Sequence, residues 1–294
     1  MGRRPGQPAA RRGDAALPEG RAARRCRGRG AVLSRRRGPD ALPGLVDSHC
    51  HLQDAAFDPD REAVLARAAA AGIERLLGPG FDLPSTRRAV ELARRHPGTV
   101  QAAVGIHPHF SAAATDADWE ELARLAAAPE VAAVGEMGLD FFRNLSPPEI
   151  QRAALARQLD LATRVGKPVL VHDRDAHDEI RSTLLAWGGR GVLHAFSGDA
   201  GMAHAMTSAG FLVSFALPVT FRSAEGPRAA AATLPDHSFL VETDSPWLAP
   251  GGAGARNEPT TALRVAVELA RLRSVAPQEL AAQVRGAYDR LLGG

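Results

Sequence analysis

Short apolar runs alternate with longer amphipathic segments from about Leu45 to the C-terminus of the chain. The apolar runs are typical of buried strands, and the segments between them, rich in Ala, Leu, Arg and Glu, repeat their apolar positions with the period of a helix. The pattern predicts strands within residues 46–51, 75–80, 99–109, 130–140, 167–175, 191–198, 210–218 and 238–246. It predicts helices over residues 58–72, 83–98, 118–128, 146–166, 175–187, 199–209, 222–233, 259–273 and 277–292.

The order of these elements predicts the fold. Strands that alternate with helices form parallel sheets, and eight such units in roughly 250 residues predict a closed (β/α)₈ TIM barrel of the α/β class. A doubly wound open sheet is the alternative, but no glycine-rich dinucleotide-binding loop follows the first strand. Asp58 and Ser146 each stand at the start of a helical pattern, and we expect them to be N-caps.

The first 43 residues differ from the rest in composition. Residues 1–40 contain 12 arginines and three acidic residues, whereas the remainder has more acidic than basic residues. The net charge of +3 is therefore the sum of a strongly basic segment and a mildly acidic remainder. Such a segment cannot bury enough apolar surface to offset its ordering entropy. We therefore expect a disordered Arg-rich extension over 1–43 and a barrel domain over 44–294. A nucleic-acid-binding arm, an unselected extension and a transit peptide stay open as interpretations of the extension.

Composition limits where the protein can work. No apolar run approaches the roughly 20 residues of a membrane-spanning helix, so we expect no contact with a membrane. The two cysteines, Cys26 and Cys50, are too few for a disulfide framework, which favours a reducing compartment. The mildly acidic remainder of the chain suits a domain that gathers divalent cations.

Ionisable residues come at the carboxyl ends of five of the predicted strands. They are His49 and His51 on the first strand, Glu136 on the fourth, His172 on the fifth, His194 on the sixth and Asp244 on the eighth. The carboxyl ends of all strands of a parallel barrel lie on one face, so we expect these side chains to meet there. Burying so many polar groups is costly unless they share a partner, and a metal centre supplies one.

Four imidazoles and two carboxylates exceed the ligands of one tetrahedral ion. They suit two divalent ions bridged by a carboxylate, which can activate a shared water and hold the leaving oxygen of a phosphodiester. The strand order assigns one ion to His49, His51 and Asp244 and the other to His172 and His194. Glu136, across the barrel mouth, would bridge them. Asp244 would also accept the proton of the attacking water, so Asp244 and Glu136 are the candidate catalytic residues.

Four further residues near this face are candidates for substrate binding. His107 and His109 end the third predicted strand and could contact phosphate or orient a ligand, although a loop-ordering His-Pro-His turn is the alternative. Arg174 could pair with a phosphate. Trp247 could stack on a base, an interaction of roughly 1–3 kcal/mol. We expect the other histidines and tryptophans outside the centre to be structural or solvated: His96, Trp119, His177, Trp187, His204 and His237.

Seven motifs resemble the signatures of the TatD-type metal-dependent deoxyribonucleases. They are VDSHCHL (46–52), GIHPH (105–109), GEMGLDF (135–141), VHDRDA (171–176), LHAFSG (193–198), VETDSPWLAP (241–250) and RNEP (256–259). The resemblance covers essentially all of residues 45–294. It implies a cytoplasmic, monomeric TIM-barrel hydrolase that uses two Mg²⁺, Mn²⁺ or Zn²⁺ ions and degrades DNA, often from the 3′ end of single strands. It also implies the same six metal ligands.

Two other functions stay open. An amidohydrolase of a small molecule or an aminoacyl ester would use the same centre, but such barrels often carry a carbamylated lysine where this chain has Glu136. Lys167 stands at the start of the fifth predicted strand, and we expect it on the opposite face. A non-catalytic nucleic-acid binder would work through the arm, and its function would survive His172→Ala.

Overall fold

The computed structural model describes residues 39–252 and 254–293, so most of the predicted extension lies outside the described residues. Eight parallel strands pair in sequence order within one sheet. They are β1 (Leu45–Asp47), β2 (Ile73–Pro79), β3 (Val100–Val104), β4 (Val131–Asp140), β5 (Val169–Arg174), β6 (Gly191–Leu193), β7 (Leu212–Phe215) and β8 (Phe239–Val241).

The sheet closes just beyond the ends of its first and last strands. The backbone N–H of Ser48 donates to Val241 O at 2.9 Å, and that of His51 donates to Ser245 O at 2.7 Å. The buried carboxylate of Asp47 accepts from the backbone N–H of Thr243 at 3.0 Å and from its hydroxyl at 2.6 Å. These bonds join the segments that follow β1 and β8, and the predicted (β/α)₈ barrel is confirmed.

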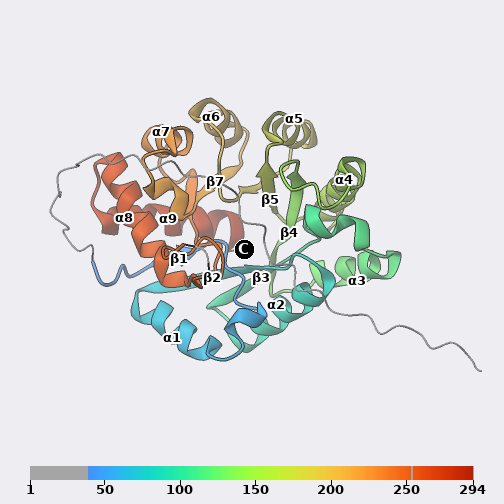
Figure 1. The fold of residues 1–294 in the computed structure, drawn as a ribbon, viewed down its shortest axis with the longest axis horizontal. Helices are drawn as coiled ribbons and strands as arrows, with labels where there is room; N and C mark the ends of the chain where they lie inside the picture. The colour runs from blue at the N-terminus through green and yellow to red at the C-terminus, as the bar shows by residue number, and fades with distance from the viewer. Residues whose placement is uncertain (1–38, 253, 294) are drawn as a thin grey trace, which may run out of the picture. The chain divides into compact units, whose positions relative to one another are not determined.

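Helices lie around the outside of the strands (Figure 1). They are α1 (Arg61–Ala70), α2 (Leu83–Arg95), α3 (Asp116–Ala126), α4 (Pro148–Val165), α5 (His177–Trp187), α6 (Ala200–Ser208), α7 (Glu225–Thr233), α8 (Ala262–Arg273) and α9 (Pro277–Leu292). Four 3₁₀ helices accompany them in the described residues: η1 (Ala55–Phe57), η2 (Pro108–Ala113), η3 (Leu217–Thr220) and η4 (Pro259–Thr261). In the part of the chain that the structure describes, no helix is both long and apolar enough to cross a membrane.

Both predicted N-caps are wrong. Helix α1 begins only at Arg61, because Asp58 closes the short helix η1 and its carboxylate pairs with the Arg61 guanidinium at 2.5 Å. Helix α4 begins at Pro148, and the Ser146 hydroxyl instead donates to His109 O at 3.1 Å. Neither side chain caps its helix, because Asp58 pairs with the first residue of α1 and Ser146 bonds to His109 in η2.

Leu42, near the end of the predicted extension, belongs to the hydrophobic core. Its side chain is fully buried, and its backbone N–H donates to Ala71 O at 2.9 Å, just after α1. The chain thus packs against the barrel slightly before the predicted start of the domain at residue 44.

Candidate metal centre

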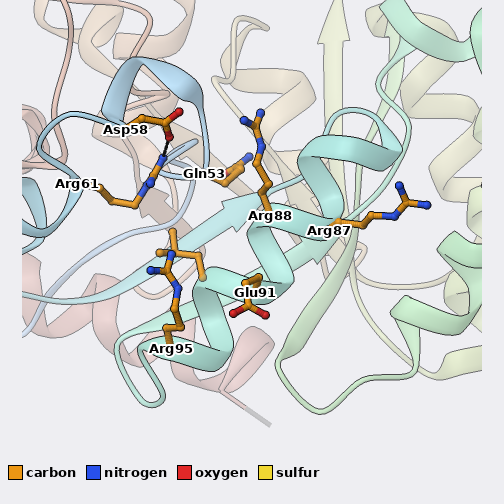
Figure 2. Close-up of a pocket in the computed structure, with 8 residues that line it drawn as sticks. Gln53, Asp58, Arg61, Arg87, Arg88, Glu91 and Arg95 are labelled. Atoms are coloured by element: carbon orange, nitrogen blue, oxygen red, sulfur yellow. Dashed lines mark hydrogen bonds and ion pairs between the residues drawn. The ribbon is translucent and has the colours of Figure 1, made fainter.

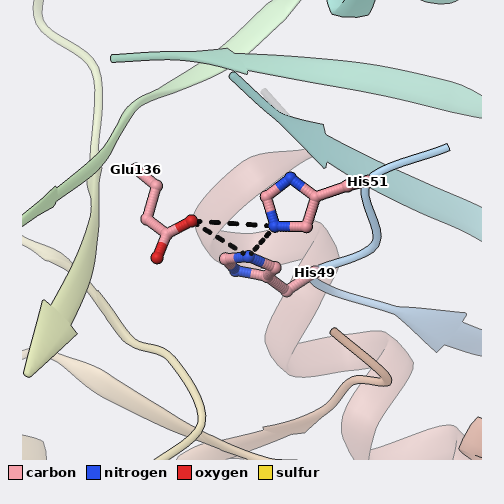
Figure 3. A group of neighbouring side chains, drawn as sticks. All are labelled: His49, His51 and Glu136. Atoms are coloured by element: carbon pink, nitrogen blue, oxygen red, sulfur yellow. Dashed lines mark hydrogen bonds and ion pairs between the residues drawn. The ribbon is translucent and has the colours of Figure 1, made fainter. Parts of the chain in front are cut away.

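Two histidines converge in the extended segment that follows β1. His49 Nε2 and His51 Nε2 lie 2.9 Å apart, and both side chains are almost fully buried (Figure 3). The predicted first strand runs to His51, but β1 ends at Asp47 and the chain bends at Ser48. Cys50 N–H still donates to Leu77 O of β2 at 3.0 Å. The two imidazoles nevertheless point to the same place, as predicted.

One carboxylate oxygen from each of two acidic residues faces this histidine pair. Glu136 Oε2 lies 3.4 Å from His49 Nε2 and 3.7 Å from His51 Nε2. Asp244 Oδ1 lies 3.6 Å from His49 Nε2 and 3.4 Å from His51 Nε2. Ligand atoms at about 2.0–2.2 Å from a tetrahedral ion are about 3.3–3.6 Å apart, and the four histidine–carboxylate distances are close to this range. The two histidine nitrogens, 2.9 Å apart, are closer than that.

A second group of donor atoms surrounds the other oxygen of Glu136. Glu136 Oε1 lies 3.2 Å from His172 Nδ1 and 2.9 Å from His194 Nε2, and these two nitrogens are 3.2 Å apart. Three protein ligands are the number that catalytic zinc sites supply, with the remaining position left for water or substrate. The structure therefore brings the six residues together in the two groups that the strand order suggested.

Hydrogen bonds set the side of each imidazole that faces the centre. The Pro79 carbonyl can only accept, so His51 Nδ1, at 3.0 Å, carries the proton and its Nε2 lone pair faces Glu136 and Asp244. On the other side, His172 Nε2 donates to Asp140 Oδ2 at 3.2 Å. Its Nδ1 is then the atom that can bind a cation, because a neutral imidazole carries only one proton.

His194 is oriented in the same way from the opposite wall. Its Nδ1 donates to Glu242 Oε1 at 3.4 Å, and that carboxylate also accepts from the backbone N–H of Ala195 at 2.9 Å. The Ser214 hydroxyl is a further donor to Glu242. These contacts fix both the buried carboxylate and the imidazole, so that His194 Nε2 points at Glu136.

His107 is a different kind of neighbour. Its Nδ1 accepts from the backbone N–H of His109 at 3.1 Å, so the proton of the neutral ring is on Nε2, which donates to Glu136 Oε1 at 3.3 Å. Burial lowers the pKa of His107 to about 4, which keeps the ring neutral. His107 therefore orients the carboxylate and offers no lone pair to a cation there. Its side chain is only 8% exposed, which leaves little surface for a substrate.

Opposing charges within the centre shift the pKa values of its members. Burial opposes ionisation of Glu136, but its interactions with His194, His107 and His49 outweigh this effect and hold the pKa of Glu136 well below its usual value. Burial likewise disfavours charged His194, but Glu136 and Glu242 raise the pKa of that imidazole well above its usual value. Protons and cations compete for the same lone pairs, so a cation that binds here would release protons.

His49 contains a buried nitrogen that no hydrogen bond within the described residues satisfies. This atom is Nδ1, on the side of the ring away from His51. The ring stacks on His194 with centroids 4.0 Å apart and planes 17° apart. Burial lowers the pKa of His49, and the charge of His194 adds to this effect. A neutral imidazole held among ligand-type atoms fits a cation site better than a structural hydrogen-bond network.

Strand β4 holds two acidic residues of the centre at once. Glu136 and Asp140 are four residues apart, so they project from the same face of the strand. Gly138 lies between them and pairs with His172 on β5. Its φ of 145° is one that residues with a side chain rarely adopt, and a Cβ there would overlap the backbone carbonyl of His172. Close approach of β4 to β5 thus depends on this glycine.

Three buried carboxylates of the centre were not among the predicted site residues: Asp47, Asp140 and Glu242. Each stands at or next to the carboxyl end of a strand, the same signal that identified the other six. All three also lie inside motifs quoted above: VDSHCHL, GEMGLDF and VETDSPWLAP. Their partners come from other strands, and only the three-dimensional arrangement shows these contacts.

The other predicted substrate residues lie around the mouth. Trp247 is 45% exposed and contacts His51 edge-on, with ring centroids 4.6 Å apart. The exposed Arg174 places its guanidinium 4.2 Å from the centre of the Phe142 ring. His109 instead donates from Nε2 to Asp140 Oδ2 at 2.7 Å, which makes it part of the network behind His172.

Two aromatic residues at the mouth were not predicted. Phe81 follows β2, and its ring lies 5.7 Å from His51. Phe110, in η2, stacks on Phe81 with centroids 5.3 Å apart and is 39% exposed. Together with Trp247 they form an aromatic platform beside the first histidine pair.

Lys167 and the remaining histidines and tryptophans lie away from the centre. The Lys167 ammonium donates to the carbonyls of Ala126 and Ala128 at 2.6 and 2.7 Å, at the end of α3. Each of the six remaining histidines and tryptophans contacts a carboxylate, hydroxyl, carbonyl or guanidinium away from the centre. The pairs are His96–Glu62, Trp119–Arg157, His177–Asp173, Trp187–Thr163, His204–Thr233 and His237–Gln283.

A parallel eight-stranded barrel with buried histidines and carboxylates at the carboxyl ends of its strands has the architecture of a metal-dependent hydrolase. The family profile described as TatD related DNase matches residues 46–293. A metal-dependent hydrolase named TatD from Mycobacterium tuberculosis is 41% identical over 251 residues, which cover 81% of this chain and 93% of the relative. This chain belongs to the TatD family and is a metal-dependent hydrolase.

Two further comparisons agree with this assignment. A protein of Erwinia tasmaniensis named 3′-5′ ssDNA/RNA exonuclease TatD is 34% identical over 248 residues, which cover 81% of this chain and 96% of the relative. The crystal structure of YjjV, a TatD homologue from Escherichia coli, superposes with a TM-score of 0.80 at 32% identity. That match covers 86% of this chain and 99% of YjjV.

Proposed function

We propose that this protein is a two-metal phosphodiesterase that removes nucleotides from the 3′ end of single-stranded DNA. The observation that carries the proposal is the position of Glu136, whose two oxygens face two separate groups of donor atoms. Such a bridge suits a pair of cations on one phosphodiester. The Erwinia relative named as a 3′-5′ ssDNA/RNA exonuclease supports the choice of substrate.

His49, His51 and Asp244 would hold one divalent cation, His172 and His194 the other, and Glu136 would bridge both. Mg²⁺, Mn²⁺ and Zn²⁺ all accept imidazole or carboxylate ligands, so the donor set leaves the choice among them open. When bound, two such cations supply positive charge that neutralises the phosphate and lowers the pKa of the attacking water. Asp140 and Glu242 keep the lone pairs of His172 and His194 turned toward the bridge.

Asp244 would accept the proton of the attacking water. Its side chain is 19% exposed, whereas that of Glu136 is 5% exposed, so Asp244 is the carboxylate that solvent can reach. Burial opposes its ionisation, but its interactions with His51 and His49 keep the pKa of Asp244 below its usual value. The left-handed φ of 53° and the bond from its N–H to His49 O at 2.9 Å hold the carboxylate beside the histidine pair.

The rim of the mouth would bind the nucleotide. Trp247, supported by Phe81 and Phe110, offers an exposed aromatic face on which an unstacked base can lie, and this favours single strands over duplexes. On the side of His172, the exposed Arg174 guanidinium makes no ion pair in the described part of the chain and can pair with a phosphate. His107 and His109 would act indirectly, through Glu136 and Asp140.

A substrate screen tests the proposal. Metal-free protein is given Mg²⁺, Mn²⁺ or Zn²⁺ and assayed on a single-stranded oligonucleotide labelled at its 5′ end, on its duplex form, and on cyclic amides and aminoacyl esters. We expect a ladder of products shortened from the 3′ end of the single strand. Turnover of an amide or ester with every oligonucleotide left intact would instead support the amidohydrolase function. The cytoplasmic location and the monomeric state stay predictions. Light scattering, which gives the molar mass in solution, tests the monomeric state.

A further inference from the structure

A hollow of about 290 Å³ lies on the surface between η1 and α2 (Figure 2). Four arginines line it against only two acidic side chains, Asp58 and Glu91. The volume is close to the roughly 300 Å³ at which small-ligand pockets begin, so it suits a group the size of one nucleotide. We call this hollow the arginine groove; the four arginines are Arg61, Arg87, Arg88 and Arg95.

Two of the arginines are already engaged, and two are not. Arg61 pairs with Asp58 and donates to Leu52 O at 2.6 Å, and Arg87 forms two bonds of 2.6 Å with Glu121. Arg88 and Arg95 are exposed and make no ion pair or side-chain hydrogen bond with any described residue. They are seven residues apart on α2, about 10 Å along the axis, so they can contact separate phosphates of one strand.

The inner wall of the groove touches the metal centre. Gln53 lines the groove, and its amide Nε2 donates to Pro79 O at 2.6 Å and lies 3.4 Å from His51 Nδ1. Phe81 stands immediately before the N-cap of α2 and also contacts His51. A strand that leaves the centre across Phe81 therefore reaches the first turns of α2.

We propose that the arginine groove binds the backbone phosphates of the nucleotides that precede the 3′-terminal one in a single strand. The inference rests on the proposed exonuclease function. Guanidinium groups bind phosphate oxygens without regard to base, so the groove would add affinity and not sequence preference. It would also make activity depend on strand length, because a dinucleotide ends before the groove begins.

The test compares the double variant Arg88→Gln, Arg95→Gln with the control Arg94→Gln. Arg94 is on the same helix but pairs with Glu130 outside the groove. The affinity for a labelled 12-nucleotide DNA is measured by fluorescence anisotropy over a range of salt, and Mn²⁺-dependent hydrolysis is measured on the 12-mer and on a dinucleotide.

Each lost phosphate contact lowers the slope of log affinity against log salt by about 0.7, which is about a fivefold loss of affinity at 0.1 M salt. We expect a loss of about 25-fold for the double variant, with little change for Arg94→Gln and unchanged hydrolysis of the dinucleotide. A wild-type slope and affinity in the double variant would overturn the groove proposal, and so would an equal loss on the dinucleotide. Failure of the exonuclease function itself would appear separately, as a wild-type protein that leaves both substrates intact.

Discussion

Replacing Glu136 with glutamine tests the bridge directly. The substitution keeps the size of the side chain and removes its charge. A glutamine has one carbonyl oxygen and one NH₂ group, so it can turn an acceptor toward His49 and His51 or toward His172 and His194, but not toward both. At least one group of donor atoms then lacks its carboxylate oxygen. We expect the bound metal to fall from about two ions to one or fewer.

The same change has a measurable effect on stability. A ligand present at 100 times its Kd stabilises the folded state by about 2.7 kcal/mol, so two occupied sites contribute about 5 kcal/mol. For a domain of this size 1 kcal/mol shifts Tm by about 2–4 °C, so saturating metal should raise the wild-type Tm by about 10–20 °C. The rise in Glu136→Gln should be half of that or less.

Elemental analysis after removal of free metal gives the stoichiometry, and differential scanning fluorimetry with and without Mn²⁺ or Zn²⁺ gives the Tm shift. Glu121→Gln is the matched control, because it removes the same charge from the surface of α3, where Glu121 pairs with Arg87. If Glu136→Gln retains two ions and the full metal-induced rise in Tm, Glu136 is not part of the centre and the reasoning is wrong.

Three further predictions concern the surroundings of the centre. Asp140→Asn should weaken metal affinity about 10–100-fold through His172, as measured by competition with a chelator; unchanged affinity would contradict the positioning role. Trp247→Ala should raise KM for single-stranded DNA by about 5–150-fold with unchanged metal content, and an effect on kcat alone would refute base stacking. The hydrogen bond to Asp173 raises the pKa of His177, so His177→Ala should destabilise the protein by at most about 1 kcal/mol at pH values below about 6.5, the usual pKa of an unfolded-state histidine. That difference should vanish as pH rises through the folded pKa, and urea unfolding at about pH 5.5 and about pH 8.5 checks the sign.

The barrel and the positions of the site residues could be predicted because both depend on local patterns. An apolar run followed by His172 or His194 indicates a strand end whatever the rest of the chain does. The limits of the strands were less predictable. The third predicted strand extends to His109, but β3 ends at Val104 because Pro108 opens a short helix and has no N–H for a sheet.

Contacts between strands could not be predicted from the sequence. The proton position on His107 depends on a backbone N–H two residues later, and its bond to Glu136 joins the segment after β3 to β4. Glu242 precedes Asp244 by two residues, yet it faces His194 while Asp244 faces the histidine pair after β1. A left-handed φ at Asp244 turns the chain between them, and alternation along a strand cannot predict it.

The glycine between Glu136 and Asp140 limits how this centre can be transferred or redesigned. A designer who copies the two carboxylates onto another barrel must also copy Gly138, because a methyl group there would push the neighbouring strand and its histidine outward. The unit to transplant is therefore the whole spacing Glu-x-Gly-x-Asp, together with the strand that faces it. The same spacing can be sought in other sequences as a compact marker of barrels that have a glutamate, and not a lysine, at this position.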